Sequence, residues 1–161
     1  MNKKQIFKIL EEVTDPEIPV ITIAELGILK EVKIQEDDSI TVTITPTYTG
    51  CPAMDMITVN IKAVLQGYGY QKVEVISQLD PAWTTDQISA EGMEKLFAYG
   101  ISPPVESTTD VSFLSGHAPL VTCPQCLSTK TQMISRFGST PCKALYKCNV
   151  CLEPFDYFKC H

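Results

Sequence analysis

The sequence has 161 residues, of which 44% are hydrophobic and 20% are charged, so the chain can build a core and is not generically disordered. Its formal net charge of −6 argues against general binding to nucleic acids or to anionic membranes. The length allows one full-sized domain, or a domain of about 100 residues with a small second domain.

Near the N-terminus, apolar residues recur at the spacing of an amphipathic helix, at Ile6, Ile9, Leu10 and Val13. We expect this helix to end near Thr14, because Asp15 precedes Pro16 and the residue before a proline is pushed away from helical angles. The segment Thr22–Glu25 has the spacing of a capping box, and Gly27 can close that turn.

A hairpin and a second helix follow. Residues 28–35 have a strand-like pattern, Asp37 and Asp38 make a turn, and alternation over residues 40–45 predicts a strand with one buried face. After a loop over residues 46–50, a helical stripe is formed by Met54, Ile57, Ile61, Val64 and Leu65. We expect Gly67 and Gly69 to end this helix.

The last elements of this half are a strand over residues 70–77 and a helix that Thr84–Asp86 opens and Gly100 ends. The resulting order is α-β-β-α-β-α. It predicts an α+β or α/β layer fold in which helices pack on a small mixed sheet.

Charge and cysteine content divide the chain. Residues 1–100 carry 8 basic and 15 acidic groups, and residues 120–161 carry 5 basic and 2 acidic groups together with six of the seven cysteines. Between them, residues 101–119 contain prolines, serines and threonines with little periodicity. We therefore expect an α/β domain over residues 1–100, a linker over 101–119 and a second domain over 120–161.

The second domain is too short to bury a useful core without a cross-link such as a bound metal ion. Two C-x2-C pairs separated by 21 residues supply the ligands for such a cross-link, namely Cys123, Cys126, Cys148 and Cys151. Four thiolates in this arrangement are typical of a structural zinc site, and residues 131–137 and 144–147 have the pattern of zinc-ribbon strands. A rubredoxin-like iron centre and buried cysteines without a metal are the alternatives. Leu127 and Leu152 stand where such knuckles often carry glycine.

Three further potential ligands lie in this domain. We interpret Cys142 as a packing residue or an incidental thiol, whereas Cys160 and His161 could replace a ligand or add a weak site. Four thiolates and one Zn²⁺ leave the domain with a charge of about +1, which argues against a nucleic-acid-binding ribbon. The N-terminus does not read as a secretory signal, and no stretch approaches the roughly 18 apolar residues of a membrane span, so we expect a soluble cytoplasmic protein.

Cys51 is placed differently from the other cysteines. It lies between Gly50 and Pro52, at the expected start of a helix, where the helix dipole would lower the pKa of the thiol for metal binding or thiol chemistry. The alternative is a small residue that fills a gap at a helix start. Asp15 and Glu17 lie in a loop fixed by prolines and form a second candidate, although simple helix termination with solvated acids explains them as well.

At these positions the sequence resembles a known family. The segments Asp15–Pro19, Leu26–Gly27 and Gly50–Pro52 are similar to those of small iron–sulfur-cluster assembly proteins that include SufT. Further segments resemble the PaaD-like proteins of phenylacetate degradation, also called PaaJ, and the likeness covers nearly the whole chain: Leu79–Asp86, Gly100–Pro104, Phe137–Thr140, Cys142–Ala144 and Glu153–Asp156.

The resemblance implies an accessory role beside phenylacetyl-CoA 1,2-epoxidase, a di-iron monooxygenase fed by an iron–sulfur flavin reductase. The chain has neither E-x-x-H pairs nor a dinucleotide fingerprint, so we expect it to be neither the oxygenase nor the reductase and not to be an enzyme. The implied role is maturation or repair of a metal centre in those partners. Cys51 would hold or hand over iron or a cluster, and Asp15 and Glu17 would shape the site. A second copy of the chain or the client would complete the ligand set.

Two other functional classes stay open. A thiol redox protein would use Cys51, but the first domain lacks a second cysteine and an evident general base. A zinc-ribbon interaction module, or a non-catalytic structural subunit of the epoxidase complex, would act through the second domain.

Overall fold

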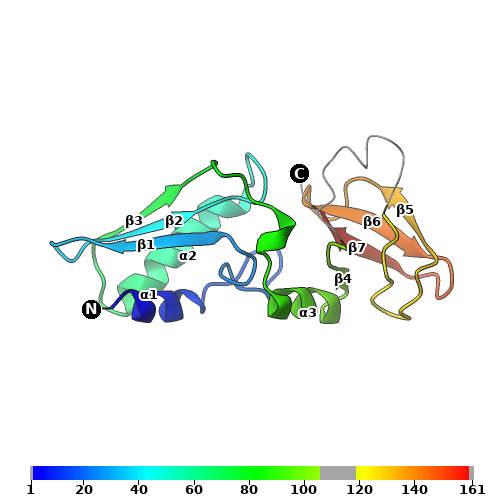
Figure 1. Cartoon of the computed structure of the whole chain (residues 1–161), viewed down its shortest axis with the longest axis horizontal. Coiled ribbons are helices and arrows are strands. Elements are labelled where there is room, and N and C mark those ends of the chain that lie inside the picture. Colours follow the sequence, from blue (N-terminus) through cyan, green and yellow to red (C-terminus); the bar gives the residue numbers. More distant parts are fainter. Residues whose placement is uncertain (1, 106–118, 160–161) are drawn as a thin grey trace. The chain divides into compact units, whose positions relative to one another are not determined.

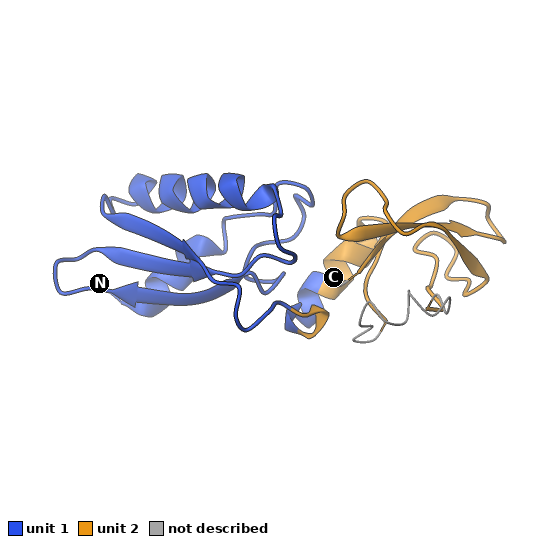
Figure 2. Cartoon of the chain, turned by 90° about the horizontal axis from the view of Figure 1, so that it is seen from above, with its two compact units in different colours: residues 1–83, 87–92 blue, residues 84–86, 93–161 orange. Residues whose placement is uncertain are grey.

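The structure is a computed structural model, and it describes residues 2–105 and 119–159. It divides into two compact units, residues 1–83 with 87–92 and residues 84–86 with 93–161 (Figure 2). The elements, labelled in Figure 1, are α1 (Lys3–Leu10), β1 (Leu29–Ile34), β2 (Ile40–Ile44), α2 (Ala53–Gly67), β3 (Val73–Ser77), η1 (Thr85–Gln87), α3 (Ala90–Ala98), β4 (Ile101–Ser102), β5 (Thr131–Ser135), β6 (Lys143–Cys148) and β7 (Pro154–Phe158).

The first unit contains the predicted small mixed sheet, in the order β1-β2-β3. β1 pairs with β2 antiparallel and β2 pairs with β3 parallel, and α2 provides the crossover that two successive parallel strands require. α1 contacts both α2 and β1, and α2 contacts β3, so the two helices pack together against the sheet. The order α-β-β-α-β-α and the α+β class are confirmed.

The core of this unit follows the predicted periodicities. Fully buried apolar residues come from both helices and from the central strand, and they include Ile6, Leu10, Ile40, Val42, Ile44, Ile57, Ile61 and Leu65. Ile40, Val42 and Ile44 share one face of β2. Thr43 on the other face and Thr45 just after the strand are buried as well. The hairpin strand therefore buries more than the single face that its alternation predicts.

Local turn chemistry explains the connections. The predicted capping box is present, since the Glu25 backbone N–H donates to Thr22 Oγ1 at 3.1 Å and the Thr22 N–H donates to a Glu25 carboxylate oxygen at 2.9 Å. Gly27 closes this turn with a φ of +74°, and a Cβ there would lie 2.5 Å from the Gln87 carbonyl oxygen. The turn therefore needs glycine both for its backbone angle and for space.

The segment predicted as one helix from residue 84 is interrupted. Residues Thr85–Gln87 form the short 3₁₀ helix η1, and the α-helix begins only at Ala90. Ser89 Oγ accepts the Gly92 backbone N–H at 3.0 Å, which is the pattern of an N-cap. The start of the predicted helix was wrong because this serine provides a stronger start signal than Thr84.

The second unit contains a sheet in the order β4-β7-β6-β5. β5, β6 and β7 are antiparallel, and β4 adds to β7 in parallel. Residues 101–102, for which the sequence predicts a linker, are therefore part of this sheet, while residues 106–118 of that predicted linker lie outside the described residues. A cluster of Tyr146, Phe155 and Tyr157 with Val121 and the cysteines Cys123 and Cys148 forms the core. In the described parts of the chain, no helix has both the length and the apolar character to cross a lipid bilayer.

Candidate functional site

The four cysteines of the C-x2-C pairs come together at one end of the second unit. Cys123 and Cys126 lie in the turn before β5, Cys148 ends β6, and Cys151 lies in the turn that leads to β7. Their sulfur atoms all lie within 4.8 Å of one another. The Cys123 and Cys151 sulfurs are 3.7 Å apart, and the Cys126 and Cys148 sulfurs are 3.5 Å apart.

This geometry fits one tetrahedral metal ion. Zn–S bonds of about 2.3 Å in a tetrahedron place the sulfurs roughly 3.8 Å from one another, which is close to the separations here. The backbone N–H groups of Cys151 and Val150 lower the pKa of the Cys148 thiol, whereas burial and the neighbouring sulfurs raise the pKa of the Cys151 thiol, so Cys148 loses its proton more readily than Cys151. The arrangement is a metal-binding cluster.

The two knuckles share an unusual backbone feature. Leu127 and Leu152 follow the second cysteine of their pairs, and both have positive φ values, 64° and 67°. Residues with a Cβ avoid this region, so the chain adopts the knuckle geometry at some cost in strain. Both side chains are largely exposed. The missing glycines therefore do not prevent the four sulfurs from converging.

Cys142 stands apart from this cluster. It is buried, and its sulfur lies 3.0 Å from Thr140 Oγ1. A single metal ion needs at least three potential ligands close together. Within residues 2–105 and 119–159, the four knuckle cysteines form such a group. Cys160 and His161 lie outside the described residues.

Cys51 lies at the end of a tight turn that precedes α2. The Cys51 backbone N–H donates to the Tyr48 carbonyl at 3.3 Å, and Gly50 within this turn has a φ of +81°. The N-cap of α2 is Pro52, so Cys51 lies one residue before the cap. Its side chain is half-buried.

The acidic loop is held by its own aspartate. Asp15 is buried, and one of its carboxylate oxygens accepts the backbone N–H groups of Glu17 at 2.8 Å and of Ile18 at 2.9 Å. The interpretation of Asp15 as a solvated acid is therefore wrong. Glu17 is half-buried, and the hydrogen bond to its backbone fixes where its side chain leaves the loop.

The loop and the thiol lie close enough to interact electrostatically, although about 35 residues separate them in sequence. Burial raises the pKa of the Cys51 thiol, and the negative charges of Glu17 and Asp15 raise it further. The Ala53 backbone N–H and the Tyr48 hydroxyl act in the opposite direction without reversing the shift. The prediction of a lowered pKa was wrong, because burial and two carboxylates outweigh the helix start.

Tyr48 was not identified from the sequence. Its position three residues before Cys51, across a turn that contains Gly50, is the signal that could have indicated it. The structure thus brings Cys51, Asp15 and Glu17 into one neighbourhood and adds Tyr48 to it.

Comparisons with known proteins agree with these two units. Residues 3–76 match the family described as iron–sulfur cluster assembly protein, and residues 107–159 match the PaaD zinc beta ribbon domain. The chain is 46% identical over 156 residues to an Escherichia coli (strain K12) protein named as a candidate subunit of 1,2-phenylacetyl-CoA epoxidase, covering 97% of this chain and 92% of that protein.

Two further relatives concern the first unit. A Porphyromonas gingivalis protein named Fe-S protein maturation auxiliary factor is 34% identical over 95 residues, which cover 58% of this chain and 90% of that protein. The crystal structure of a DUF59 domain of unknown function from Bacillus anthracis matches with a TM-score of 0.55 and 28% identity, over 58% of this chain and 90% of the other. With an iron–sulfur assembly domain, a PaaD zinc ribbon and a relative of nearly equal length, the chain belongs to the PaaD family.

Proposed function

We propose that this protein is an accessory factor, not an enzyme, that assembles or repairs an iron or iron–sulfur centre in the phenylacetyl-CoA epoxidase system. The observation that supports this most strongly is the convergence of the Cys51 thiol with the loop that carries Asp15 and Glu17. Relatives of this unit are named as maturation auxiliary factors, which favours the same class of function.

The donor set suits iron that is held for a short time. A thiolate is a soft ligand and carboxylates are hard ligands, and iron accepts both kinds. Because the pKa of the Cys51 thiol is raised, the thiol is protonated at neutral pH before it binds, and binding of the metal must displace this proton. That requirement weakens binding at neutral pH, as expected of a site that passes its cargo on.

One cysteine is too few for a complete cluster, since iron–sulfur clusters usually have four protein ligands. In this proposal the client protein, or a second copy of this chain, supplies the remaining ligands. The iron–sulfur reductase of the epoxidase system is the proposed client, because its cluster needs cysteine ligands. Cys51 is then one ligand of a shared intermediate, and Glu17 is a candidate oxygen ligand beside it.

The knuckle cysteines have a different role in this proposal. A tetrahedral set of four thiolates with no open position is typical of a structural zinc ion, which stabilises the small unit and leaves no coordination site for substrate. We propose that this zinc holds the ribbon in the form that contacts the partner subunits, and that the protein works in the cytoplasm with those subunits.

The alternative is a permanent non-catalytic subunit of the epoxidase, which the name of the E. coli relative favours. The two functions differ in when the protein is needed. A maturation factor is needed before turnover, whereas a subunit is needed during turnover.

The test is to purify the epoxidase and reductase from cells that contain the wild type, the Cys51→Ser variant or no copy of this protein. Cluster content and activity are then measured separately. We expect low cluster content with Cys51→Ser or with no copy, and full activity of mature components after this protein is removed. Fully loaded components that stay inactive until this protein is added back would overturn the proposal in favour of the subunit role.

A further inference from the structure

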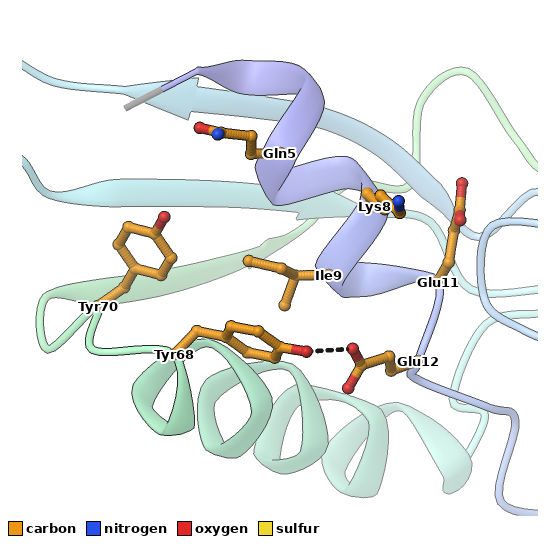
Figure 3. A pocket seen from close by; sticks show the side chains of 7 residues that line it. All are labelled: Gln5, Lys8, Ile9, Glu11, Glu12, Tyr68 and Tyr70. Atoms are coloured by element: carbon orange, nitrogen blue, oxygen red, sulfur yellow. Dashed lines mark hydrogen bonds between the residues drawn. The ribbon is translucent and has the colours of Figure 1, made fainter.

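A pocket of about 620 Å³ lies in the first unit, between α1 and the turn that follows α2. Its lining consists of Gln5, Lys8, Ile9, Glu11, Glu12, Tyr68 and Tyr70 (Figure 3). Cys51 precedes the start of α2, whereas the two tyrosines of this pocket follow the last residue of α2. The 15 residues of that helix extend over about 22 Å, so the aromatic end of the pocket is separate from Cys51.

The turn after α2 places two tyrosines in this pocket by backbone hydrogen bonds. The Tyr70 N–H donates to the Leu65 carbonyl at 3.0 Å, and the Gly69 N–H donates to the Gln66 carbonyl at 2.9 Å. With the φ of +95° at Gly69, these bonds form the Schellman motif that commonly ends a helix. The backbone that carries the tyrosines on either side of Gly69 is therefore fixed before any ligand arrives.

The lining combines an apolar surface with two aromatic rings. Figure 3 shows Ile9 pointing from α1 toward the space in front of Tyr68 and Tyr70. The Tyr68 side chain is 55% exposed, so its ring is accessible to a ligand. A flat aromatic surface next to an aliphatic side chain suits a ligand with a hydrocarbon stem and a planar head.

The charges around the pocket favour a cation. Two carboxylates, Glu11 and Glu12, face only one ammonium group among the lining residues, that of Lys8, and they lie at the C-terminal end of α1, where the helix dipole is negative. The Tyr68 hydroxyl donates a hydrogen bond to Glu12 Oε1 (Figure 3). This hydrogen bond and the charge of Glu12 raise the pKa of Tyr68, as expected where the potential is negative. Residues 1–100 as a whole, with 8 basic and 15 acidic groups, also attract a basic partner.

From these observations we propose that the pocket binds the side chain of an arginine from a partner protein. The guanidinium group would stack on the Tyr68 ring and pair with the Glu12 carboxylate, while its methylene stem would lie over Ile9. Arginine fits better than lysine, because a planar guanidinium both stacks on aromatic rings and forms two parallel hydrogen bonds with a carboxylate. This partner-binding site goes beyond the proposed maturation function and does not depend on Cys51.

The proposal can be tested with the full zinc-loaded chain by amide NMR. Nα-acetyl-arginine amide is the probe, and Nα-acetyl-citrulline amide, which has nearly the same shape without the charge, is the comparison. We expect saturable shifts at Ile9, Tyr68 and Tyr70 with the arginine probe, and binding at least about tenfold weaker with citrulline. Nα-acetyl-lysine amide should bind about threefold more weakly than arginine.

Three variants separate the contribution of the Glu12 charge to binding from that of the Tyr68 ring. Glu12→Gln removes the charge and should weaken the arginine probe about fivefold, whereas Glu36→Gln makes the same substitution in the β1–β2 turn and should leave binding unchanged. Tyr68→Leu keeps an apolar surface but removes the ring, and it should weaken binding about threefold. The NMR spectra report whether each variant is folded.

Equal binding of arginine and citrulline, or wild-type affinity in both Glu12→Gln and Tyr68→Leu, would overturn the proposal. Binding of lysine as tightly as arginine would overturn the assignment to a guanidinium. Because Cys51 is unchanged in every variant, these outcomes are independent of the iron-handling proposal.

Discussion

Leu127 and Leu152 occupy equivalent positions in the two cysteine knuckles, and both have left-handed backbone angles, with φ of 64° and 67°. The equivalence indicates that the metal-binding geometry imposes this backbone conformation on two unrelated segments. A residue with a Cβ in the left-handed conformation destabilises the folded state by about 1–2 kcal/mol. Glycine avoids this strain, but it loses more conformational entropy on folding, which costs about 0.5–1 kcal/mol.

The backbone strain at these two positions predicts a difference in zinc affinity. Leu127→Gly should bind zinc more tightly than Leu127→Ala by about threefold, because both variants remove the same exposed side chain and only glycine relieves the backbone strain. Competition with a chromogenic chelator measures the difference. An alanine variant that holds zinc as tightly as the glycine variant would show that the positive φ carries no cost.

The metal site should control folding of the second unit. Cys123→Ser should lose one equivalent of zinc and unfold the ribbon while the first unit stays folded, because metal binding and folding are coupled in such small units. Zinc analysis and amide hydrogen exchange measure the two effects. The matched control is Cys142→Ser, a buried cysteine outside the cluster, which should keep its zinc. A full equivalent of zinc in the Cys123→Ser protein would refute the ligand assignment.

The reactivity of Cys51 should depend on pH in a defined direction. Because its pKa is raised, the thiol is mostly protonated at pH 7, so alkylation should be slower than for a free cysteine and should accelerate only at a higher pH than for a free cysteine. Glu17→Gln removes a negative charge that disfavours the thiolate, so it should lower the pKa and speed alkylation at pH 7. Alkylation rates over a pH series, resolved by peptide mapping, measure this.

Two further variants complete that experiment, one with the opposite expected effect and one as a control. Tyr48→Phe removes a hydroxyl that favours the thiolate and should therefore slow alkylation. Glu36→Gln changes a glutamate in the turn at the opposite end of β2 and should have no effect. Faster alkylation of the wild type than of a free cysteine at pH 7 would contradict the raised pKa.

The loop that faces Cys51 should depend on the Asp15 carboxylate. Asp15→Ala leaves the backbone N–H groups of Glu17 and Ile18 without their acceptor, so we expect a loss of about 1–3 kcal/mol in the free energy of unfolding of the first unit. Asp15→Asn keeps an oxygen acceptor and should lose less. Urea denaturation followed by Trp83 fluorescence measures the difference. Equal stability of the alanine variant and the wild type would rule out this role.

Local patterns explain why much of the structure could be predicted from the sequence. The helical spacing of Ile57, Ile61 and Leu65, the alternation along β2 and the two C-x2-C pairs each act over a few residues, and each element formed as expected. The capping box at Thr22 and the helix end at Gly69 are likewise local. These signals place the elements and the metal site without knowledge of the tertiary fold.

Two of the errors arose where distant segments meet. The sign of the Cys51 pKa shift depends on burial and on Asp15 and Glu17, which approach from a loop about 35 residues away. The strand β4 forms because it can pair with β7, more than 50 residues later, although its two residues carry no strand pattern of their own. Neither effect is visible in a short window of sequence.

The most direct test of the central claim is anaerobic transfer of iron to the proposed client. Zinc-loaded wild type and Cys51→Ser are each given radioactive ferrous iron and sulfide, mixed with the metal-free reductase and separated, and the iron in the reductase is counted. We predict that the wild type delivers iron to the reductase, whereas Cys51→Ser delivers less than about a tenth as much, because oxygen is a poor substitute for a soft thiolate. Equal delivery by the two proteins, or delivery no faster than from free iron and sulfide, would contradict the role of Cys51 in maturation.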